Sequence, residues 1–506
     1  MQSKQYFTKI KNYPHEKSTE PKYVLNPQYV LRHGGNKSFI ISCQGYGEKS
    51  SICIIHPVYA MMLSFFKGRT KGEIYAEISE LFHLSSELVS SQLDKLIDNT
   101  DYIECEKSFF PPHLIIEYKD GMKIPSYNYK DFSYKEVDLC MSRLDAPIDI
   151  ICNLTLHCAT SCIYCYANRK GNQTKHMDVS LVESILDQAK ELGVIRFKLM
   201  GGEIMLYKGW ERIVKKSIEY GFQPDISTKK PITEKEIQKW IELGATTDPI
   251  QISLDTLIKE HLYQILKVND PYYDQIKESI NLLEKYHVTY VVHTVINRFN
   301  DNVEDIRSLA TFFKGKKYLK RWMFDAAKCS MYNGLLYKEY KTSAQKIAEI
   351  GDYVSELNRQ RIFSFKLYKP SVLRDFNKLT IEEKAEHFEK RTMCSGNLNA
   401  LYILPDGKVT ICEELYWHPH FIIGDLKKQT LKEIWNSQKA KDIFYLKQSS
   451  IPSDSPCSSC QDFFECRKYK HICWRDTILA YGADKWYYPD ISCPKAPHIN
   501  KDIAIE

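Results

Sequence analysis

Three cysteines stand close together in the first half of the sequence. Cys158, Cys162 and Cys165 follow an apolar segment, 148–156, with three and then two residues between them. Three thiolates on one short loop can bind three irons of a [4Fe–4S] cube and leave the fourth iron open to a ligand. A zinc site is the alternative, but zinc takes a fourth ligand, and His157 lies too close to Cys158 to serve easily. The spacing therefore favours an iron–sulfur cluster.

A pair of glycines and an acid end the next expected strand, in the sequence Leu199-Met200-Gly201-Gly202-Glu203. Glycines allow the backbone to approach a ligand closely. Glu203 carries the charge needed to hold an ammonium group. Such a motif is weak evidence alone, because glycines at strand ends are usually only turns. It becomes stronger when it lies one strand–helix unit after a cysteine loop.

The C-terminal part of the chain is rich in cysteine. Seven cysteines are Cys394, Cys412, Cys457, Cys460, Cys466, Cys473 and Cys493. In a reducing compartment such residues are metal ligands or catalytic thiols more often than disulfides. Spacing alone leaves open a pair of structural zinc sites.

Alternating strands and helices must position these groups. Strands are expected at 148–156, 196–200, 224–227, 249–254, 289–296 and 320–324. Helices are expected between them at 181–192, 210–220, 234–243, 272–287 and 303–313. Repeated strand-then-helix units indicate a parallel sheet or barrel, and six of them would make an incomplete barrel with an open side.

A smaller α+β unit precedes the barrel. Two strands, 29–32 and 38–41, flank a glycine-containing turn. Three helices follow: one over 57–66, one after the N-cap Thr70 and one after Ser85. The second is expected to bury Ile74, Ile78 and Leu81, and the third Leu88, Leu93, Leu96 and Ile97.

Composition bounds the location and the partners of the protein. The net charge is +6 over 506 residues, with acidic and basic residues mixed, which does not indicate nucleic acid. The N-terminus lacks the apolar core of a signal peptide, and no apolar stretch is long enough to span a membrane. We expect a cytoplasmic protein that binds neither nucleic acid nor membrane.

The CxxxCxxC motif, the Gly-Gly-Glu motif and Gln251-Ile252-Ser253-Leu254-Asp255 together resemble the radical S-adenosylmethionine (SAM) superfamily. The resemblance implies that Cys158, Cys162 and Cys165 hold a [4Fe–4S] cluster whose open iron binds SAM. It further implies a 5′-deoxyadenosyl radical that abstracts hydrogen from the substrate. The residues implied in binding SAM are Tyr164, Gly201, Gly202, Glu203, Ser227, Ser253 and Asp255. For Ser227, Ser253 and Asp255, a buried serine or a helix cap remains an equal interpretation.

The C-terminal cysteines, together with Leu404-Pro405-Asp406-Gly407 and Ile423-Gly424-Asp425-Leu426, resemble the SPASM domain. That domain usually carries two auxiliary [4Fe–4S] clusters. The resemblance assigns Cys394, Cys412 and Cys473 to one, and Cys457, Cys460, Cys466 and Cys493 to the other. The spacing departs from the family at Cys473, because Lys470 stands where a cysteine is expected. The first cluster then has an open iron or a ligand from elsewhere, with Cys329 a candidate.

Glu413 follows the second SPASM cysteine. In sulfatase-maturing relatives an aspartate at this place acts as a base, so the resemblance makes Glu413 the candidate catalytic acid or base. A solvated surface acid is the equal alternative, and Glu414 stands beside it.

The N-terminal unit resembles the RiPP recognition element, a winged-helix-like domain that binds the leader of a precursor peptide along a sheet edge. A DNA-binding winged helix is disfavoured because the third helix has one lysine and three acids. The expected fold is α/β: a partial (β/α)6 TIM-type barrel with an N-terminal winged-helix-like domain and a C-terminal SPASM domain. The boundaries are a flexible N-terminus at 1–21, the leader-binding domain at 22–120, a linker at 121–145, the barrel at 146–335, bridging helices at 336–390 and the SPASM domain at 391–506.

These resemblances imply an oxidoreductase that forms an intramolecular thioether, C–C or C–O crosslink in a precursor peptide. Its cofactors would be SAM, the radical SAM [4Fe–4S] cluster and two auxiliary [4Fe–4S] clusters. An external one-electron donor, such as flavodoxin or ferredoxin, would supply electrons. The alternatives are a peptide epimerase with Cys329 or Cys140 as its thiol, a sulfatase-maturase-like oxidation of a protein side chain, and a binding protein that has lost its radical site.

Overall fold

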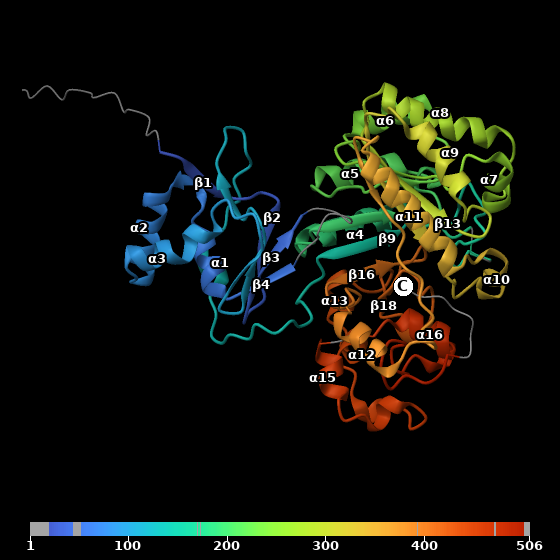
Figure 1. Cartoon of the computed structure of the whole chain (residues 1–506). Helices are drawn as coiled ribbons and strands as arrows, with labels where there is room; N and C mark the ends of the chain where they lie inside the picture. Colours follow the sequence, from blue (N-terminus) through green and yellow to red (C-terminus); the bar gives the residue numbers. More distant parts are fainter. Residues whose placement is uncertain are drawn as a thin grey trace, which may run out of the picture. The chain divides into compact units, whose positions relative to one another are not determined.

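The computed structural model describes residues 20–43, 52–169, 171–172, 174–391, 393–469 and 472–499. The chain divides into two compact units, Met1–Met141 and Ser142–Glu506 (Figure 1). Nearly all of the expected flexible N-terminus at 1–21, and Lys470, lie outside the described residues. Within the described part, no helix is both long enough and apolar enough to cross a membrane.

The first unit contains small antiparallel sheets and three helices. Its sheets have the strand orders β5-β1-β8, β2-β3-β4 and β6-β7. Their strands are β1 (Lys22–Leu25), β2 (Tyr29–His33), β3 (Ser38–Ser42), β4 (Ile52–Ile55), β5 (Lys67–Thr70), β6 (Ile103–Cys105), β7 (Ser108–Phe110) and β8 (Ile115–Glu117). The helices are α1 (Pro57–Leu63), α2 (Lys71–Phe82) and α3 (Ser86–Leu93).

The expected caps form, but the helix faces differ in part. The Thr70 hydroxyl accepts from Glu73 N, whose side chain binds Thr70 in return, and the Ser85 hydroxyl accepts from Leu88 N. The first helix ends at Leu63 because the chain then turns into β5. Leu81 is 36% and Leu88 46% exposed, so both were wrongly assigned to the core. Helical spacing identifies a face, but only the packing shows how wide the buried stripe is.

The segment expected to be a linker contributes to the first unit. Phe132 is buried in its core, and Tyr129 stacks on Phe65 with ring centroids 5.7 Å apart. Lys37 is 1% exposed, and its ammonium hydrogen-bonds the carbonyl of Cys140 and lies 3.8 Å from a carboxylate oxygen of Asp138. A buried ammonium needs such partners, so this polar segment closes over Lys37.

The second unit contains the expected barrel strands, each within a few residues of its predicted place. They are β9 (Asp149–Asn153), β10 (Arg196–Met200), β11 (Ser227–Thr228), β12 (Ile250–Ser253), β13 (Tyr290–Ile296) and β14 (Leu319–Ala326). All are parallel to their barrel neighbours, in two sheets: β10 with β9, and β11-β12-β13-β14 continued by β15 (Lys366–Tyr368). The helices between them are α4 (Val179–Glu191), α5 (Trp210–Glu219), α6 (Glu234–Leu243), α7 (Lys259–Leu266), α8 (Pro271–Lys285) and α9 (Val303–Phe313).

Helices cover one face of the barrel strands. Figure 1 shows α6 to α9, in green and yellow, beside the sheet that holds β13. Along β13, Tyr290, Val292 and Ile296 are fully buried and belong to the core shared with the helices. His293 and Val295, on the other face, are only partly buried. This alternation leaves the second face of the strands for the site.

The cysteine-rich part of the chain extends the barrel sheet. β16 (Ala400–Ile403) runs parallel to β9, and β17 (Lys408–Thr410) and β18 (Gly424–Asp425) follow it antiparallel. The preceding helices are α10 (Tyr337–Tyr340), α11 (Ala344–Gln360) and α12 (Ile381–Lys390), and the following ones are α13 (Leu431–Trp435), α14 (Gln438–Phe444), α15 (Phe463–Tyr469) and α16 (Trp474–Tyr481). The barrel and the cysteine-rich domain are thus joined through one sheet.

Candidate functional site

The first cysteine loop leaves the end of β9 and is fixed by its backbone. Two of its backbone N–H groups donate to carbonyls at the end of α7. Ser161 N donates to Leu266 at 2.9 Å, and Ile163 N donates to Ile265 at 3.0 Å. The Cys158 thiol lies 3.4 Å from the carbonyl oxygen of Gly202.

The thiols of this loop lie close together: besides burial, Cys165 helps to raise the pKa of Cys162, and Cys158 helps to raise that of Cys165. Burial raises the pKa of the Cys162 thiol to about 11, with Lys229 acting against it. Cysteine thiolates are the metal-binding form, so metal binding here would release protons.

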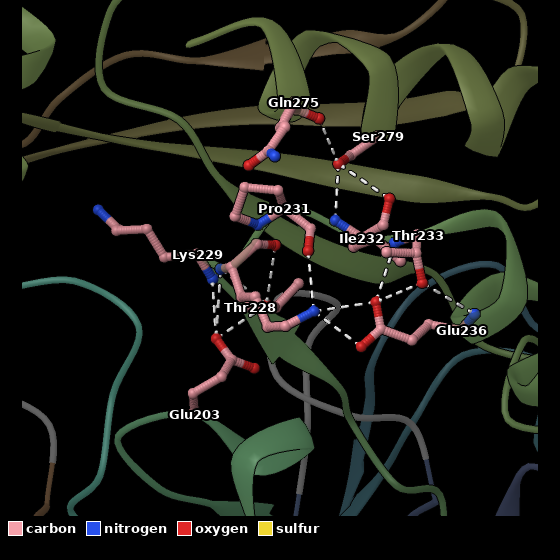
Figure 2. A network of polar contacts seen from close by, with 10 residues as sticks. Glu203, Thr228, Lys229, Pro231, Ile232, Thr233, Glu236, Gln275 and Ser279 are labelled. Atoms are coloured by element: carbon pink, nitrogen blue, oxygen red, sulfur yellow. Dashed lines mark hydrogen bonds and ion pairs between the residues drawn. The ribbon is translucent and has the colours of Figure 1, made fainter. Parts of the chain in front are cut away.

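Glu203 is held by one oxygen and leaves the other without a partner. Its Oε2 accepts from Thr228 Oγ1 at 2.9 Å and from the backbone N–H groups of Lys229 and Lys230 at 3.3 Å each. Figure 2 shows Glu203 beside Thr228 and Lys229. Lys230 is in turn bound to Glu236 at the start of α6. Glu203 is 2% exposed, and its buried Oε1 has no hydrogen-bond partner.

An unsatisfied buried carboxylate oxygen is costly unless a ligand completes it. Burial raises the pKa of Glu203 to about 7. Its free oxygen suits an amino group, so the residue present fits the SAM amino group that the sequence assigned to it.

The glycines before Glu203 bring the strand end against the cysteine loop. A Cβ on Gly202 would lie 2.2 Å from the His157 carbonyl oxygen, and one on Gly201 would lie 3.0 Å from that of Thr155. Real Cβ atoms do not approach so closely, so glycine is required at position 202. The two motifs found in the sequence are therefore in direct contact.

Tyr164 and Asp255 meet Lys229 beside the cysteine loop. The Tyr164 hydroxyl donates to Asp255 Oδ2 at 2.5 Å, and the Lys229 ammonium reaches the same oxygen at 3.0 Å. Asp255 Oδ1 accepts from Val295 N at 3.0 Å. Burial opposes the charge of Lys229, but Asp255 and the Cys162 thiol outweigh it and raise its pKa. Both oxygens of Asp255 are thus engaged by the chain itself.

The two candidate serines lie on the open face of the sheet. Ser227 Oγ accepts from Gln251 Nε2 at 2.7 Å, and Ser253 stands beside His293 in the strand register. His293 Nε2 lies 2.8 Å from Asp325 Oδ2 on β14. Paired residues of parallel strands point to the same side, so Ser253 and His293 share one face.

Two residues of this site were missed by the sequence reasoning. Lys229 follows Ser227 at the end of β11, a strand-end position that would have pointed to it. Tyr272 lies on α8, donates to the Lys229 carbonyl at 2.7 Å and lies near Cys158, Cys162 and Glu203. Helical periodicity does not distinguish Tyr272, because its position in the pattern is that of an ordinary core residue.

The structure brings Cys394, Cys412 and Cys473 together; we call them the first auxiliary set. The Cys394 thiol lies close enough to the other two to affect their ionisation. Burial raises the pKa of Cys412 and Cys473 well above the usual value. Asp476 also faces this set. Cys329 belongs to a buried cluster with Tyr337, Tyr340 and Leu479, against which Tyr164 packs.

Cys457, Cys460, Cys466 and Cys493, the second auxiliary set, line one cavity of about 410 Å³. Burial raises the pKa of Cys493 to about 11. Arg391 lies near thiols of both sets, Cys394 and Cys466, and forms an ion pair with Asp490.

Zinc ions and iron–sulfur clusters place different demands on the thiols that hold them. Among the described residues, no three His, Cys, Asp or Glu side chains converge tightly enough to hold a single metal ion. A zinc ion would draw its sulfur ligands to about 2.3 Å from one point. A [4Fe–4S] cube spreads its cysteines around four irons, which suits four thiols that surround a cavity.

Glu413 faces the first cysteine loop. Its carboxyl group lies close to Tyr166, the residue after Cys165, and near Lys198 and Lys328. Burial, and the neighbouring Glu414, raise its pKa. Glu413, which follows Cys412 of the first auxiliary set, therefore reaches Tyr166, which follows Cys165 of the first cysteine loop.

Two parts of the chain match known protein families. Residues 152–313 match the radical SAM superfamily, and residues 394–461 match the SPASM iron–sulfur cluster-binding domain. The PqqA peptide cyclase of Granulibacter bethesdensis is 21% identical over 337 residues, covering 65% of this chain and 84% of the relative. The crystal structure of Streptococcus suis SuiB bound to SAM is similar over 93% of this chain and 99% of SuiB, with a TM-score of 0.63 and 16% identity.

The chain is a radical SAM enzyme that carries a SPASM domain. Its cofactors are SAM, a radical SAM [4Fe–4S] cluster and SPASM iron–sulfur clusters. SuiB has also been crystallised with its precursor peptide SuiA, in a structure with a TM-score of 0.61 to this chain over the same coverage and 14% identity. Because the likeness to SuiB extends over nearly the whole chain, the shared fold includes the first unit.

Proposed function

We propose that this enzyme modifies a ribosomally made precursor peptide and forms an intramolecular thioether, C–C or C–O crosslink in it. The observation that carries the proposal is the closeness of Glu413, an acid of the cysteine-rich domain, to Tyr166, which follows the segment holding Cys158, Cys162 and Cys165, here called the radical loop. The fold shared with SuiB, whose structure holds a precursor peptide, supports a peptide substrate. We place the enzyme in the cytosol, with an external one-electron donor such as flavodoxin or ferredoxin.

Bound SAM and the radical SAM cluster would supply a 5′-deoxyadenosyl radical, which takes a hydrogen atom from the peptide. Cys158, Cys162 and Cys165 would hold the cluster, and Glu203 Oε1 would accept from the SAM amino group. Tyr164 would contact the adenine, and Ser227 and Ser253 the ribose or carboxylate. Asp255 is proposed for the same contacts, and it also orients Tyr164 through their hydrogen bond.

The cysteine-rich domain would supply oxidising capacity and a base. Forming a crosslink after hydrogen abstraction releases one electron and one proton. We propose one [4Fe–4S] cluster at each auxiliary set, which makes two electron acceptors. Glu413 is the proposed proton acceptor, because it is the acid that faces the radical loop.

The first unit is the proposed leader-binding domain. Within the described residues β4 stands at the end of the sheet β2-β3-β4, where a peptide strand could be added. Its third helix, α3, is acidic rather than basic, which disfavours DNA.

Epimerisation is a second candidate, because Cys329 belongs to a buried cluster against which Tyr164 of the radical loop packs. A thiol there could return hydrogen to a peptide radical. Full conversion of the peptide by Cys329→Ala would exclude that role.

Iron and sulfide content, measured anaerobically, tests the cofactor assignment. We expect about twelve irons in the wild type and about eight in Cys158→Ala/Cys162→Ala/Cys165→Ala. About four irons falling to none would leave the auxiliary sets without clusters and would contradict the oxidative proposal.

Co-expression with short peptides encoded beside the gene, followed by mass spectrometry, tests the substrate: a loss of two hydrogens marks a crosslink, and an unchanged mass with altered stereochemistry marks epimerisation.

A further inference from the structure

Arg475, at the start of α16, is a buried arginine with three partners from three segments. It is 8% exposed. Its Nε donates to Glu414 Oε2 at 2.9 Å, one terminal nitrogen to Asp476 Oδ1 at 2.6 Å and the other to the Cys329 carbonyl at 2.9 Å. The rigid guanidinium fork suits such simultaneous contacts, which a lysine could not reproduce.

The two carboxylates that Arg475 binds belong to residues in contact with the first auxiliary set. The backbone N–H of Glu414 faces the Cys412 thiol, and that of Asp476 faces the Cys473 thiol. Arg475 itself follows Cys473 directly. Without it, two partly buried carboxylates would stand unbalanced beside three thiolates, and uncompensated charge away from water is costly.

The third partner of Arg475 opens a loop, residues 329–333, that spans two sites. Asn333 Nδ2 donates to the Cys165 carbonyl at 3.0 Å, and Ser330 Oγ to the Tyr166 carbonyl at 3.3 Å. The Tyr332 hydroxyl donates to the carbonyl of Glu414 at 3.0 Å. This loop, which we call the bridging loop, therefore touches both the radical loop and the segment after Cys412.

Arg475 also separates the two adjacent acids. It binds Glu414, whereas Glu413 faces Tyr166, Lys198 and Lys328. Neighbouring side chains with such different partners point in different directions, and the guanidinium fixes which acid turns inward.

We propose that Arg475 is a positioning residue that offsets the charge of Glu414 and Asp476 beside the first auxiliary set. It thereby raises the reduction potential of the cluster held there. Its bond to the bridging loop also fixes the first auxiliary set relative to the radical loop. The inference rests on the proposed function only in requiring a cluster at Cys394, Cys412 and Cys473. A nearby positive charge favours the reduced, more negative state of a cluster, which is the direction of the effect.

The test is a redox titration of the reconstituted holoenzyme followed by electron paramagnetic resonance, with signals assigned by Cys412→Ala and Cys466→Ala. Arg475→Gln should shift the potential of the first auxiliary cluster to more negative values and leave the other two unchanged. Arg475→Lys keeps the charge and should shift it less. Glu414→Gln removes a negative charge and should shift it the opposite way.

Arg467 provides a matched control, because its guanidinium lies 3.9 Å from the Cys457 thiol of the second auxiliary set. Arg467→Gln should move only the second cluster's potential. If Arg475→Gln loads full iron with an unchanged potential, or moves all three alike, the role of Arg475 is overturned. If the Arg475→Gln variant fails to load iron, Glu414→Gln and Asp476→Asn provide the test. The role of Arg475 is overturned if neither variant raises the potential of the first auxiliary cluster. If Cys412→Ala leaves the iron content unchanged, the first auxiliary set holds no cluster, and the cofactor assignment is contradicted as well.

Discussion

Lys229 and Asp255 form a buried ion pair with 3.0 Å between the ammonium nitrogen and Oδ2. The Asp255 side chain is fully buried and that of Lys229 is 13% exposed. The pair links the ends of β11 and β12, and Tyr164 of the cysteine loop binds the same carboxylate. It therefore joins the barrel to the loop that carries the radical cluster.

Removing the lysine of this pair should destabilise the fold. Lys229→Met leaves Asp255 buried and uncompensated, which costs about 3 to 5 kcal/mol of unfolding free energy. Anaerobic urea denaturation measures it, and adding Asp255→Asn should recover part of the loss. Lys239→Met is the control, because its partners Glu211 and Glu242 are exposed and such pairs contribute about 0 to 1 kcal/mol. Equal effects of the two lysine variants would contradict the prediction.

Gly202→Ala should disturb the junction of the two motifs. The added Cβ would meet the His157 carbonyl oxygen at 2.2 Å, so the backbone must shift, at a cost of about 1 to 3 kcal/mol. We expect lower thermal stability and weaker SAM binding. Gly351→Ala within α11 meets nothing within 4 Å and should be neutral or stabilising by about 0.5 to 1 kcal/mol. A Gly202→Ala protein with wild-type stability would show that the loops are not in contact.

SAM affinity should depend on pH through Glu203. Its pKa is about 7 in the free site, and the SAM amino group is best held by the ionised carboxylate. Below pH 7 binding must first remove a proton, so affinity should rise between pH 6 and pH 8 and then level off. Equilibrium dialysis against labelled SAM measures this. Glu203→Gln should bind more weakly and lose this slope, which separates it from the ligand's own titration. A slope that survives in Glu203→Gln must come from another group.

The first unit should fold alone when it ends at position 141 but not at 120. Its core is its own, and residues 121–141 supply Phe132 and the partners of Lys37. A fragment of residues 20–141 should unfold cooperatively in circular dichroism. A fragment of residues 20–120 should be markedly less stable, because the buried Lys37 ammonium would lose the Cys140 carbonyl and the Asp138 carboxylate. Equal stability would restore the interpretation of 121–145 as a linker.

Local patterns in the sequence located much of this molecule. The six barrel strands were predicted because apolar runs alternate with helical periodicity, and the helix starts at Thr70 and Ser85 because caps are local. The pairing of β16 with β9 could not be predicted, since no local pattern specifies a partner so distant in sequence. The closing of residues 121–141 over Lys37 was missed for the same reason.

The candidate site divides in the same way. Cysteine spacing and the Gly-Gly-Glu motif located the groups that carry chemistry. Lys229, Tyr272 and Arg475 were not found, because their importance lies in burial and partners, which the tertiary structure alone supplies. The outward-facing Leu81 and Leu88 show the converse, where a correct periodicity overstates the core.

The parallel pairing of Ala400 in β16 with Asp149 in β9 also affects how the chain is made. The strand that leads into the radical cysteines has one edge neighbour that emerges from the ribosome about 250 residues later. At about 5 to 20 residues per second, that edge stays open for roughly 10 to 50 seconds of synthesis. During this interval the nascent barrel exposes an unpaired strand next to three reactive thiols. Timely protection by chaperones, and delivery of iron and sulfide only after release, would therefore govern the yield of active enzyme.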